Sequence, residues 1–137
     1  MKKRIFAALC ALLLILSLSA CAAKKTTCTL TIACETALTS AGLDAETVAA
    51  LPSDGYLLPA TEVEFTDGES VLEVLRRTAQ EHALTLDVVD GEYPYVNAIG
   101  PLAGGSAGPM AGWLVSVNGE YPSVGVADIK VQAGDAM

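Results

Sequence analysis

The sequence predicts a small α+β domain in which one main helix covers one face of a sheet. Three observations lead to this fold class. Short stretches of alternating apolar and polar residues recur along the chain, residues 70–82 have the spacing of an amphipathic helix, and Asn118-Gly119 separates two further strand-like stretches. Residues 27–137 are long enough for a single domain with one hydrophobic core.

The first half of this domain holds two candidate strands and a short candidate helix. Residues 27–33 alternate threonine with leucine and isoleucine, which is typical of a half-buried strand. Residues 40–50 place apolar side chains on one side of a short helix, and the turn-forming residues that follow end it. Residues 62–65 alternate again, so Val63 and Phe65 are expected to point into the core.

The clearest helix of the chain begins at Ser70. Ser70 is a candidate N-cap, and Glu73 stands three residues later, where it completes a capping box. The apolar residues that follow share one face at helical spacing: Val71, Leu72, Leu75 and Ala79. His82, the only histidine, lies at the end of this helix, and we interpret it as a solvated residue rather than a catalytic group.

The second half contains a strand, a long irregular stretch and a hairpin. Residues 84–89 alternate and predict a strand. Residues 93–112 are rich in glycine and proline without periodicity, which fits either a surface connection or a loop that contacts a ligand. Residues 113–117 alternate as a strand does, and Asn118 and Gly119 accept the positive φ of a type I′ turn.

The N-terminus is interpreted as a bacterial lipoprotein signal peptide covering residues 1–20. A basic start precedes an apolar stretch, residues 5–18, that is shorter than the roughly 20 residues of a comfortable membrane span. Leu18-Ser19-Ala20-Cys21 resembles a lipobox, so Cys21 is the expected lipidation site and residues 21–26 the lipidated tether. The protein is then expected to be extracytoplasmic and lipid-anchored to the bacterial cell membrane or cell surface. The alternative is an uncleaved anchor with an incidental cysteine.

The charge of the mature chain restricts its partners. Residues 21–137 hold 16 acidic and five basic side chains, hence a formal charge of −11. This balance argues against nucleic acid as a partner, because nucleic acid requires basic patches. It also argues against adsorption to anionic lipid, so the lipid on Cys21 is expected to provide the contact with the membrane.

Signatures of catalysis are absent from the sequence. There is no Ser-His-Asp set, no Cys-His pair, no HExxH or CxxC motif and no phosphate-binding loop, so we expect neither an enzyme nor a metal site. Cys28 and Cys34 point the same way on one strand but about 20 Å apart, too far to pair within a straight strand. Whether they pair at all is left open.

Four stretches taken in order resemble one family. They are the pattern GW-xxx-VNG-x-YP-xx-G of residues 112–125, the opening stretch 28–34, the stretch 61–75 and the closing stretch 128–135. Together they are similar to a bacterial family of unknown function related to the C-terminal domain of transcobalamin and intrinsic factor. The resemblance implies a β-grasp-like mixed sheet over residues 27–137. In the family, the turn at residues 134–135 leads into a further strand, so we expect the domain to be truncated at its last strand, with an exposed edge along residues 27–33.

The resemblance also implies a ligand site. In transcobalamin-like proteins the loop that leads into the GW strand, and that strand, cover one face of a corrinoid. Matched by motif, the ligand-binding residues would be Gly108, Pro109, Met110, Gly112 and Trp113, with Tyr121 nearby. No cofactor is implied other than a corrinoid held as ligand. Trp113 fits either a core position beneath the helix or a ligand-stacking position.

Two functions follow as expectations. The first is a lipid-anchored ligand-binding module that captures cobalamin-like or other small ligands for uptake and passes them to a transporter or surface-protein partner. The second is a surface adhesion or assembly module that binds protein or glycan, which would present an exposed strand edge or an apolar patch. The ligand, the partner and the oligomeric state do not follow from the sequence.

Overall fold

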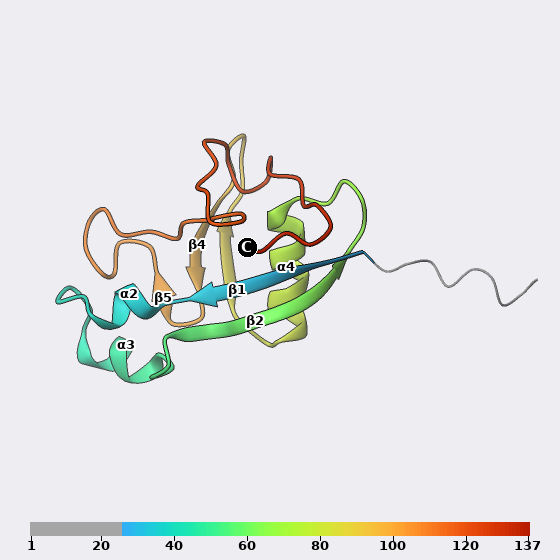
Figure 1. The fold of residues 1–137 in the computed structure, drawn as a ribbon. Coiled ribbons are helices and arrows are strands. Elements are labelled where there is room, and N and C mark those ends of the chain that lie inside the picture. The colour runs from blue at the N-terminus through green and yellow to red at the C-terminus, as the bar shows by residue number, and fades with distance from the viewer. Residues whose placement is uncertain (1–25) are drawn as a thin grey trace, which may run out of the picture.

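The computed structural model describes residues 26–137, and these form an α+β domain, so the predicted fold class is confirmed (Figure 1). The predicted signal peptide, the lipidation site Cys21 and all of the tether except residue 26 lie outside the described residues. In chain order the elements are β1 (Thr26–Ala33), α2 (Glu35–Leu38), α3 (Ala45–Ala50), β2 (Tyr56–Phe65), α4 (Val71–Glu81), β3 (Leu86–Val89), β4 (Tyr95–Ile99) and β5 (Leu102–Ala103).

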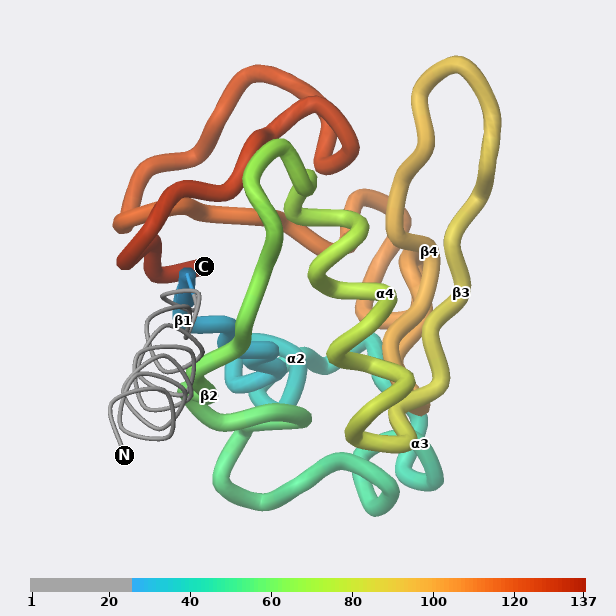
Figure 2. The backbone as a smooth tube through the Cα atoms, turned by 90° about the vertical axis from the view of Figure 1, so that its right-hand side faces the viewer, coloured from blue at the N-terminus to red at the C-terminus, as the bar shows by residue number. Residues whose placement is uncertain are grey.

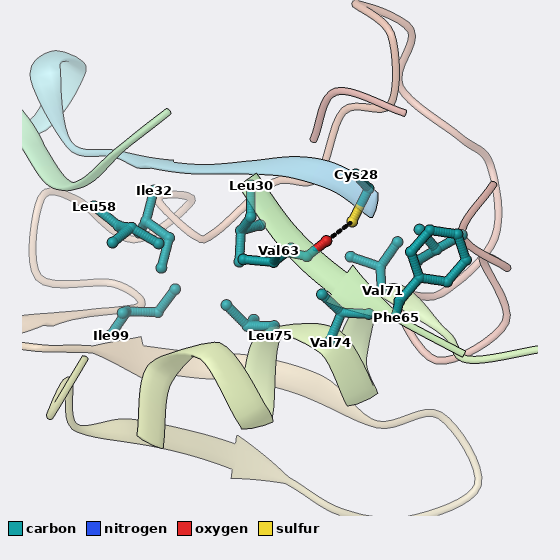
Figure 3. Close-up of a cluster of buried hydrophobic side chains, with 11 residues drawn as sticks. Cys28, Leu30, Ile32, Leu58, Val63, Phe65, Val71, Val74, Leu75 and Ile99 are labelled. Atoms are coloured by element: carbon teal, nitrogen blue, oxygen red, sulfur yellow. Dashed lines mark hydrogen bonds between the residues drawn. The ribbon is translucent and has the colours of Figure 1, made fainter. Parts of the chain in front are cut away.

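The named strands form two antiparallel sheets. β1 pairs with β2 from Thr26 opposite Phe65 to Ala33 opposite Tyr56, with irregular register near the end of β1. The second sheet has the order β3-β4-β5. α4 packs against one face of the β1–β2 pair, as the sequence predicts for its main helix (Figure 3).

The core lies between that helix and the first sheet. Alternation along β1 and β2 turns their apolar side chains toward α4, because successive side chains of a strand point to opposite faces. Burying each such side chain contributes about 1.5–3 kcal/mol. The buried residues include Leu30, Ile32, Val63 and Phe65 from the strands and Val71, Val74 and Leu75 from the helix, with Ile99 of β4 beside them (Figure 3).

The start of α4 confirms the predicted capping box. The Ser70 amide donates to the Glu73 carboxylate at 2.7 Å, and the Glu73 amide donates to Ser70 Oγ at 3.3 Å. The closing part of the chain holds the same helix end, because the Val71 amide donates to the Ile129 carbonyl and the Val131 amide to the Glu69 carbonyl.

The last four residues lie alongside β1 and make the first sheet mixed. Residues 134–137 run parallel to β1 and exchange four backbone hydrogen bonds with it, at Thr27, twice at Thr29 and at Thr31. The C-terminus therefore lies beside β1 (Figure 1). The expectation of an exposed edge is wrong for Thr27–Thr31, because residues 134–137 already pair with that edge.

Other element boundaries differ from the sequence-based expectation. The helix expected over residues 40–50 begins only at Ala45, where the Asp44 carboxylate accepts from the Thr47 amide. β4 and β5 lie within residues 93–112, which carry no periodic signal. β4 pairs with β3 and with β5, and this pairing stabilises both strands, so a local pattern could not reveal them. Residues 113–117, expected as a strand, form none among the described residues.

Candidate functional site

An open groove of about 910 Å³ lies beside β1. One wall is the second half of β1 and the start of α2, and the other is residues 110–116. Figures 1 and 2 place the C-terminal end of the chain between these two walls. Side chains from the core line the rest of the groove: Val71 and Leu75 of α4, Val96 and Ile99 of β4, and Leu102 of β5. The lining is therefore mostly apolar.

Trp113 is fixed in the wall of this groove. Its side chain is half-buried and packs against both hydrophobic clusters, the main core and a smaller one around Cys34, Leu51 and Leu102. The indole Nε1–H donates to the Leu102 carbonyl at 3.1 Å. The ring is thus both a packing element of the domain and part of the groove lining.

The groove brings together four of the six residues that the resemblance singles out. Met110, Gly112, Trp113 and Tyr121 line it. Met110 and Tyr121 are highly exposed, at 98% and 72%. Gly108 and Pro109 are not among the lining residues; they follow a loop that contacts the connection between α2 and α3.

That loop is held by contacts with the connection between α2 and α3. The Ser40 hydroxyl donates to the Ala107 carbonyl at 2.9 Å. Gly42 lies so close that a Cβ there would stand 2.5 Å from the same carbonyl oxygen, so only glycine fits. These contacts place Gly108 and Pro109 outside the groove lining.

The turn at residues 118–119 connects the groove to the C-terminus. Asn118 and Gly119 have φ of 53° and 82°, the positive values that a type I′ turn requires. Val117 and Glu120 exchange two backbone hydrogen bonds across it, at 2.8 and 3.0 Å. The hairpin is short, because this single pair is its only bridge among the described residues.

A side-chain latch joins this turn to the last residues. Asn118 Nδ2–H donates to Asp135 Oδ1 at 2.8 Å, and the Ala136 amide donates to Asn118 Oδ1 at 3.0 Å. The buried Asp135 carboxylate also accepts from the Gln132 amide at 2.8 Å. We call this set the Asn118–Asp135 latch. The sequence analysis interpreted Asp135 only as part of a closing turn. The one signal for its role was its place in that turn, three residues after Gln132, because aspartate side chains in turns accept hydrogen bonds from nearby backbone amides.

One charged side chain, that of Glu35, lies at the end of the groove away from the C-terminal residues. Glu35, at the start of α2, is the only aspartate, glutamate, lysine, arginine or histidine among the described lining residues. It lies beside Tyr56, and its hydrogen bond and negative charge raise the pKa of that phenol. The groove therefore runs from the C-terminal residues at one end to a carboxylate at the other.

The two cysteines of the domain do not form a reactive site. Cys28 and Cys34 are free thiols, exposed by only 2% and 1%. Burial is the main reason that the pKa of each is raised, so both stay protonated and unreactive. Within residues 26–137 no group of three acidic, histidine or cysteine side chains could hold a metal ion. Within the same range, no helix has the length and apolarity needed to cross a bilayer.

Comparison with protein families gives a match over the second half of the chain. Residues 68–137, just over half of the chain, match the family described as "Domain of unknown function (DUF4430)". The matched region runs from the turn before α4 to the C-terminus and includes Trp113 and the latch. A search of the curated proteins found no match.

Proposed function

This chain belongs to the DUF4430 family, and we propose that it is an extracytoplasmic, lipid-anchored module that binds a small ligand in the groove beside Trp113. Cobalamin-like compounds are the first ligand class to test, because the chain resembles the C-terminal domain of transcobalamin. The observation that carries the proposal is the groove of about 910 Å³ with a fixed tryptophan in its wall. Small-molecule sites are concave, mostly apolar and about 300–1,000 Å³ in volume.

The chemistry of the lining suits a ligand with a flat apolar face. The Trp113 N–H is already bonded to Leu102, so the polar edge of the ring is satisfied within the domain and the ring itself offers apolar surface. Met110 and Tyr121 add adaptable and aromatic surface at the mouth. The proposal assigns no catalytic step to the chain.

The cell-surface part of the proposal rests on the lipobox-like residues 18–21. A lipid on Cys21 would hold the domain at the membrane, and each buried methylene of such a chain contributes about 0.8 kcal/mol. A ligand captured there would be passed to a transporter or another surface protein for uptake.

Titration of Trp113 fluorescence tests this function, because Trp113 is the only tryptophan of the chain. Cobalamin and its precursors should quench the emission saturably, beyond the inner-filter loss seen with free N-acetyltryptophanamide. Tyr121→Ala should weaken binding several-fold, whereas Tyr93→Ala, an equally exposed tyrosine outside the groove, should not. Absence of quenching and of calorimetric heat with every corrinoid at high micromolar concentration would remove the cobalamin version of the proposal.

A second candidate function is a surface adhesion or assembly module that binds protein or glycan. Two observations favour it: Leu114 beside the groove is 81% exposed, and residues 112–116 have a backbone without hydrogen bonds to other described residues. Exposed apolar side chains beside an open strand edge are typical of protein-binding surfaces.

A further inference from the structure

We propose that Asn118 is a deamidation site controlled by the Asn118–Asp135 latch, and that the product of the reaction keeps the latch open. In deamidation the side-chain amide of an asparagine becomes a carboxylate without the help of an enzyme. The inference goes beyond ligand binding, because it assigns a covalent modification to this turn. Three features support it: the glycine after Asn118, the hydrogen bonds of the Asn118 side chain, and the carboxylate that this side chain faces.

The first feature is the glycine at position 119. Its backbone nitrogen can attack Cγ of the preceding asparagine, and glycine hinders this attack least because it has no side chain. No atom lies within 4 Å of the place where a Cβ on Gly119 would stand, so the approach is open. The Gly119 amide donates to no acceptor among the described residues. Asn118 and Gly119 are both exposed, so water reaches the reacting atoms.

Water is the only co-reactant that the chemistry needs. The Gly119 nitrogen forms a bond to Asn118 Cγ, the Cγ–Nδ2 bond breaks, and Nδ2 leaves as ammonia with the proton of the Gly119 amide. The remaining ring is a succinimide, which water opens at either of its two carbonyl carbons. Opening at Cγ gives aspartate at position 118. Opening at the main-chain carbonyl gives isoaspartate, whose main chain is one carbon longer.

The second feature is the pair of hydrogen bonds that hold the side-chain amide. Asn118 Nδ2–H donates to Asp135 Oδ1 at 2.8 Å, and Asn118 Oδ1 accepts from the Ala136 amide at 3.0 Å. The attack makes Cγ tetrahedral and expels Nδ2, so both atoms must move away from these partners. The closed latch therefore slows the reaction, and local opening of the latch permits it.

The third feature is the buried carboxylate of Asp135, which the aspartate product would face. Deamidation replaces the Nδ2 donor with a carboxylate oxygen, so two negative charges would stand where a hydrogen bond of 2.8 Å is now made. Like charges at such a distance repel each other strongly. In the isoaspartate product, the longer main chain displaces the Asn118 amide from the Ala136 carbonyl, to which it now donates at 2.7 Å.

Either product therefore weakens the hold on residues 134–137 beside β1. Gly119, Ala136 and Met137 line one end of the groove, so the modification also changes that end of the candidate binding site. Because hydrolysis of the succinimide does not restore the amide, the change runs in one direction. The latch is thus a slow chemical switch whose closed state protects Asn118.

The first experiment follows deamidation in the full chain at mildly alkaline pH by mass spectrometry, with each conversion located by fragmentation. The chain has two asparagines, and Asn97 is the internal control. Its Nδ2 is also bonded to an aspartate, Asp87, at 2.6 Å, but alanine follows it instead of glycine. In urea Asn118 should convert well before Asn97, and in the folded chain more slowly than in urea. Equal rates for the two asparagines in urea would overturn the proposal.

A pair of variants tests the control by the latch. Asp135→Ala removes the acceptor of Nδ2 and should speed the conversion of Asn118 in the folded chain by about tenfold. Asp44→Ala is the matched control, because it removes the cap of α3 and leaves the latch intact, and it should convert at the parent rate. Equal acceleration in both variants would show that general unfolding limits the reaction and would overturn the role of the latch.

A second pair tests the effect of the product. Asn118→Asp reproduces the aspartate product, and amide hydrogen exchange at residues 134–137 should be about tenfold faster than in the parent. Adding Asp135→Asn places an amide opposite a carboxylate again, with the positions exchanged, and leaves an oxygen to accept from the Gln132 amide. Exchange should then return close to the parent rate.

The aged parent chain, separated from the unmodified chain by its additional negative charge, gives the same comparison without a substitution. Its residues 134–137 should also exchange faster. Unchanged exchange in the aged chain, or the absence of rescue in the double variant, would overturn the proposal that the product keeps the latch open.

Discussion

The Asn118–Asp135 latch should contribute a measurable part of the free energy of unfolding. In Asp135→Ala the amides of Asn118 and Gln132 lose their acceptor, and both of those hydrogen bonds are 2.8 Å long and end on a carboxylate. A hydrogen bond to a charged group contributes about 1.5–3 kcal/mol to stability. Both donors belong to exposed residues, Asn118 and Gln132, so water can replace the lost carboxylate and the cost falls at the low end of this range. We therefore expect Asp135→Ala to lower the free energy of unfolding by about 1–2 kcal/mol.

Urea unfolding followed by Trp113 fluorescence and circular dichroism measures this change. Asp135→Asn should show about half the loss, because one of its two carboxylate positions becomes an amide that faces another donor. Asp67→Ala, an exposed aspartate in a turn, is the control and should change stability by less than about 0.5 kcal/mol. Amide exchange at residues 134–137 should also accelerate in Asp135→Ala, since the latch holds them against β1. If Asp135→Ala matches the parent in both measurements, the latch does not stabilise the domain as argued.

Three further predictions follow from other contacts. Ser70→Ala removes the N-cap acceptor of α4 and should cost about 1 kcal/mol in thermal unfolding; an unchanged midpoint would contradict the capping box. The hydrogen bond from Arg77 holds the pKa of Glu69 below its usual value near 4.5, so its stabilisation is complete above that pH and is lost as the pH falls through the lower folded value. Glu69→Gln should flatten this acid-side loss, and an unaltered pH profile would show that the pair contributes nothing. Cys28 and Cys34, being buried, should react with iodoacetamide at about pH 8 only after unfolding, which mass spectrometry can follow peptide by peptide; rapid labelling of the folded chain would contradict their burial.

The parts of the fold that were predicted correctly depend on local features of the sequence. α4 begins at its predicted cap because Ser70 and Glu73 satisfy each other's backbone amides locally. The amides of Val71 and Leu72 are satisfied by carbonyls of the closing part of the chain, which the sequence did not predict. β1 was recognisable because one of its faces is buried and the other is not. The positive φ of Asn118 and Gly119 likewise depends on those two residue types.

Non-local pairing decided the parts that were missed. β4 has no clean alternation of buried and exposed residues, and it exists through pairing with β3 and β5. The parallel alignment of residues 134–137 with β1 joins segments that are about a hundred residues apart, so no window of sequence could show it. Residues 113–117 show the converse: they have strand-like alternation without a strand partner among the described residues.

For the candidate site, the sequence by itself determined the residue types and their order: a lone tryptophan after a glycine-rich stretch, a two-residue turn, and an acidic chain without catalytic motifs. Only the tertiary structure decided that Trp113 is half-buried in a groove wall, that Gly108 and Pro109 lie outside that groove, and that residues 134–137 fill one end of it. The physical reason is that a residue's chemistry belongs to its own side chain, whereas a groove and an open strand edge arise from backbones brought together by packing of the core. An edge is open only where no distant segment has paired with it.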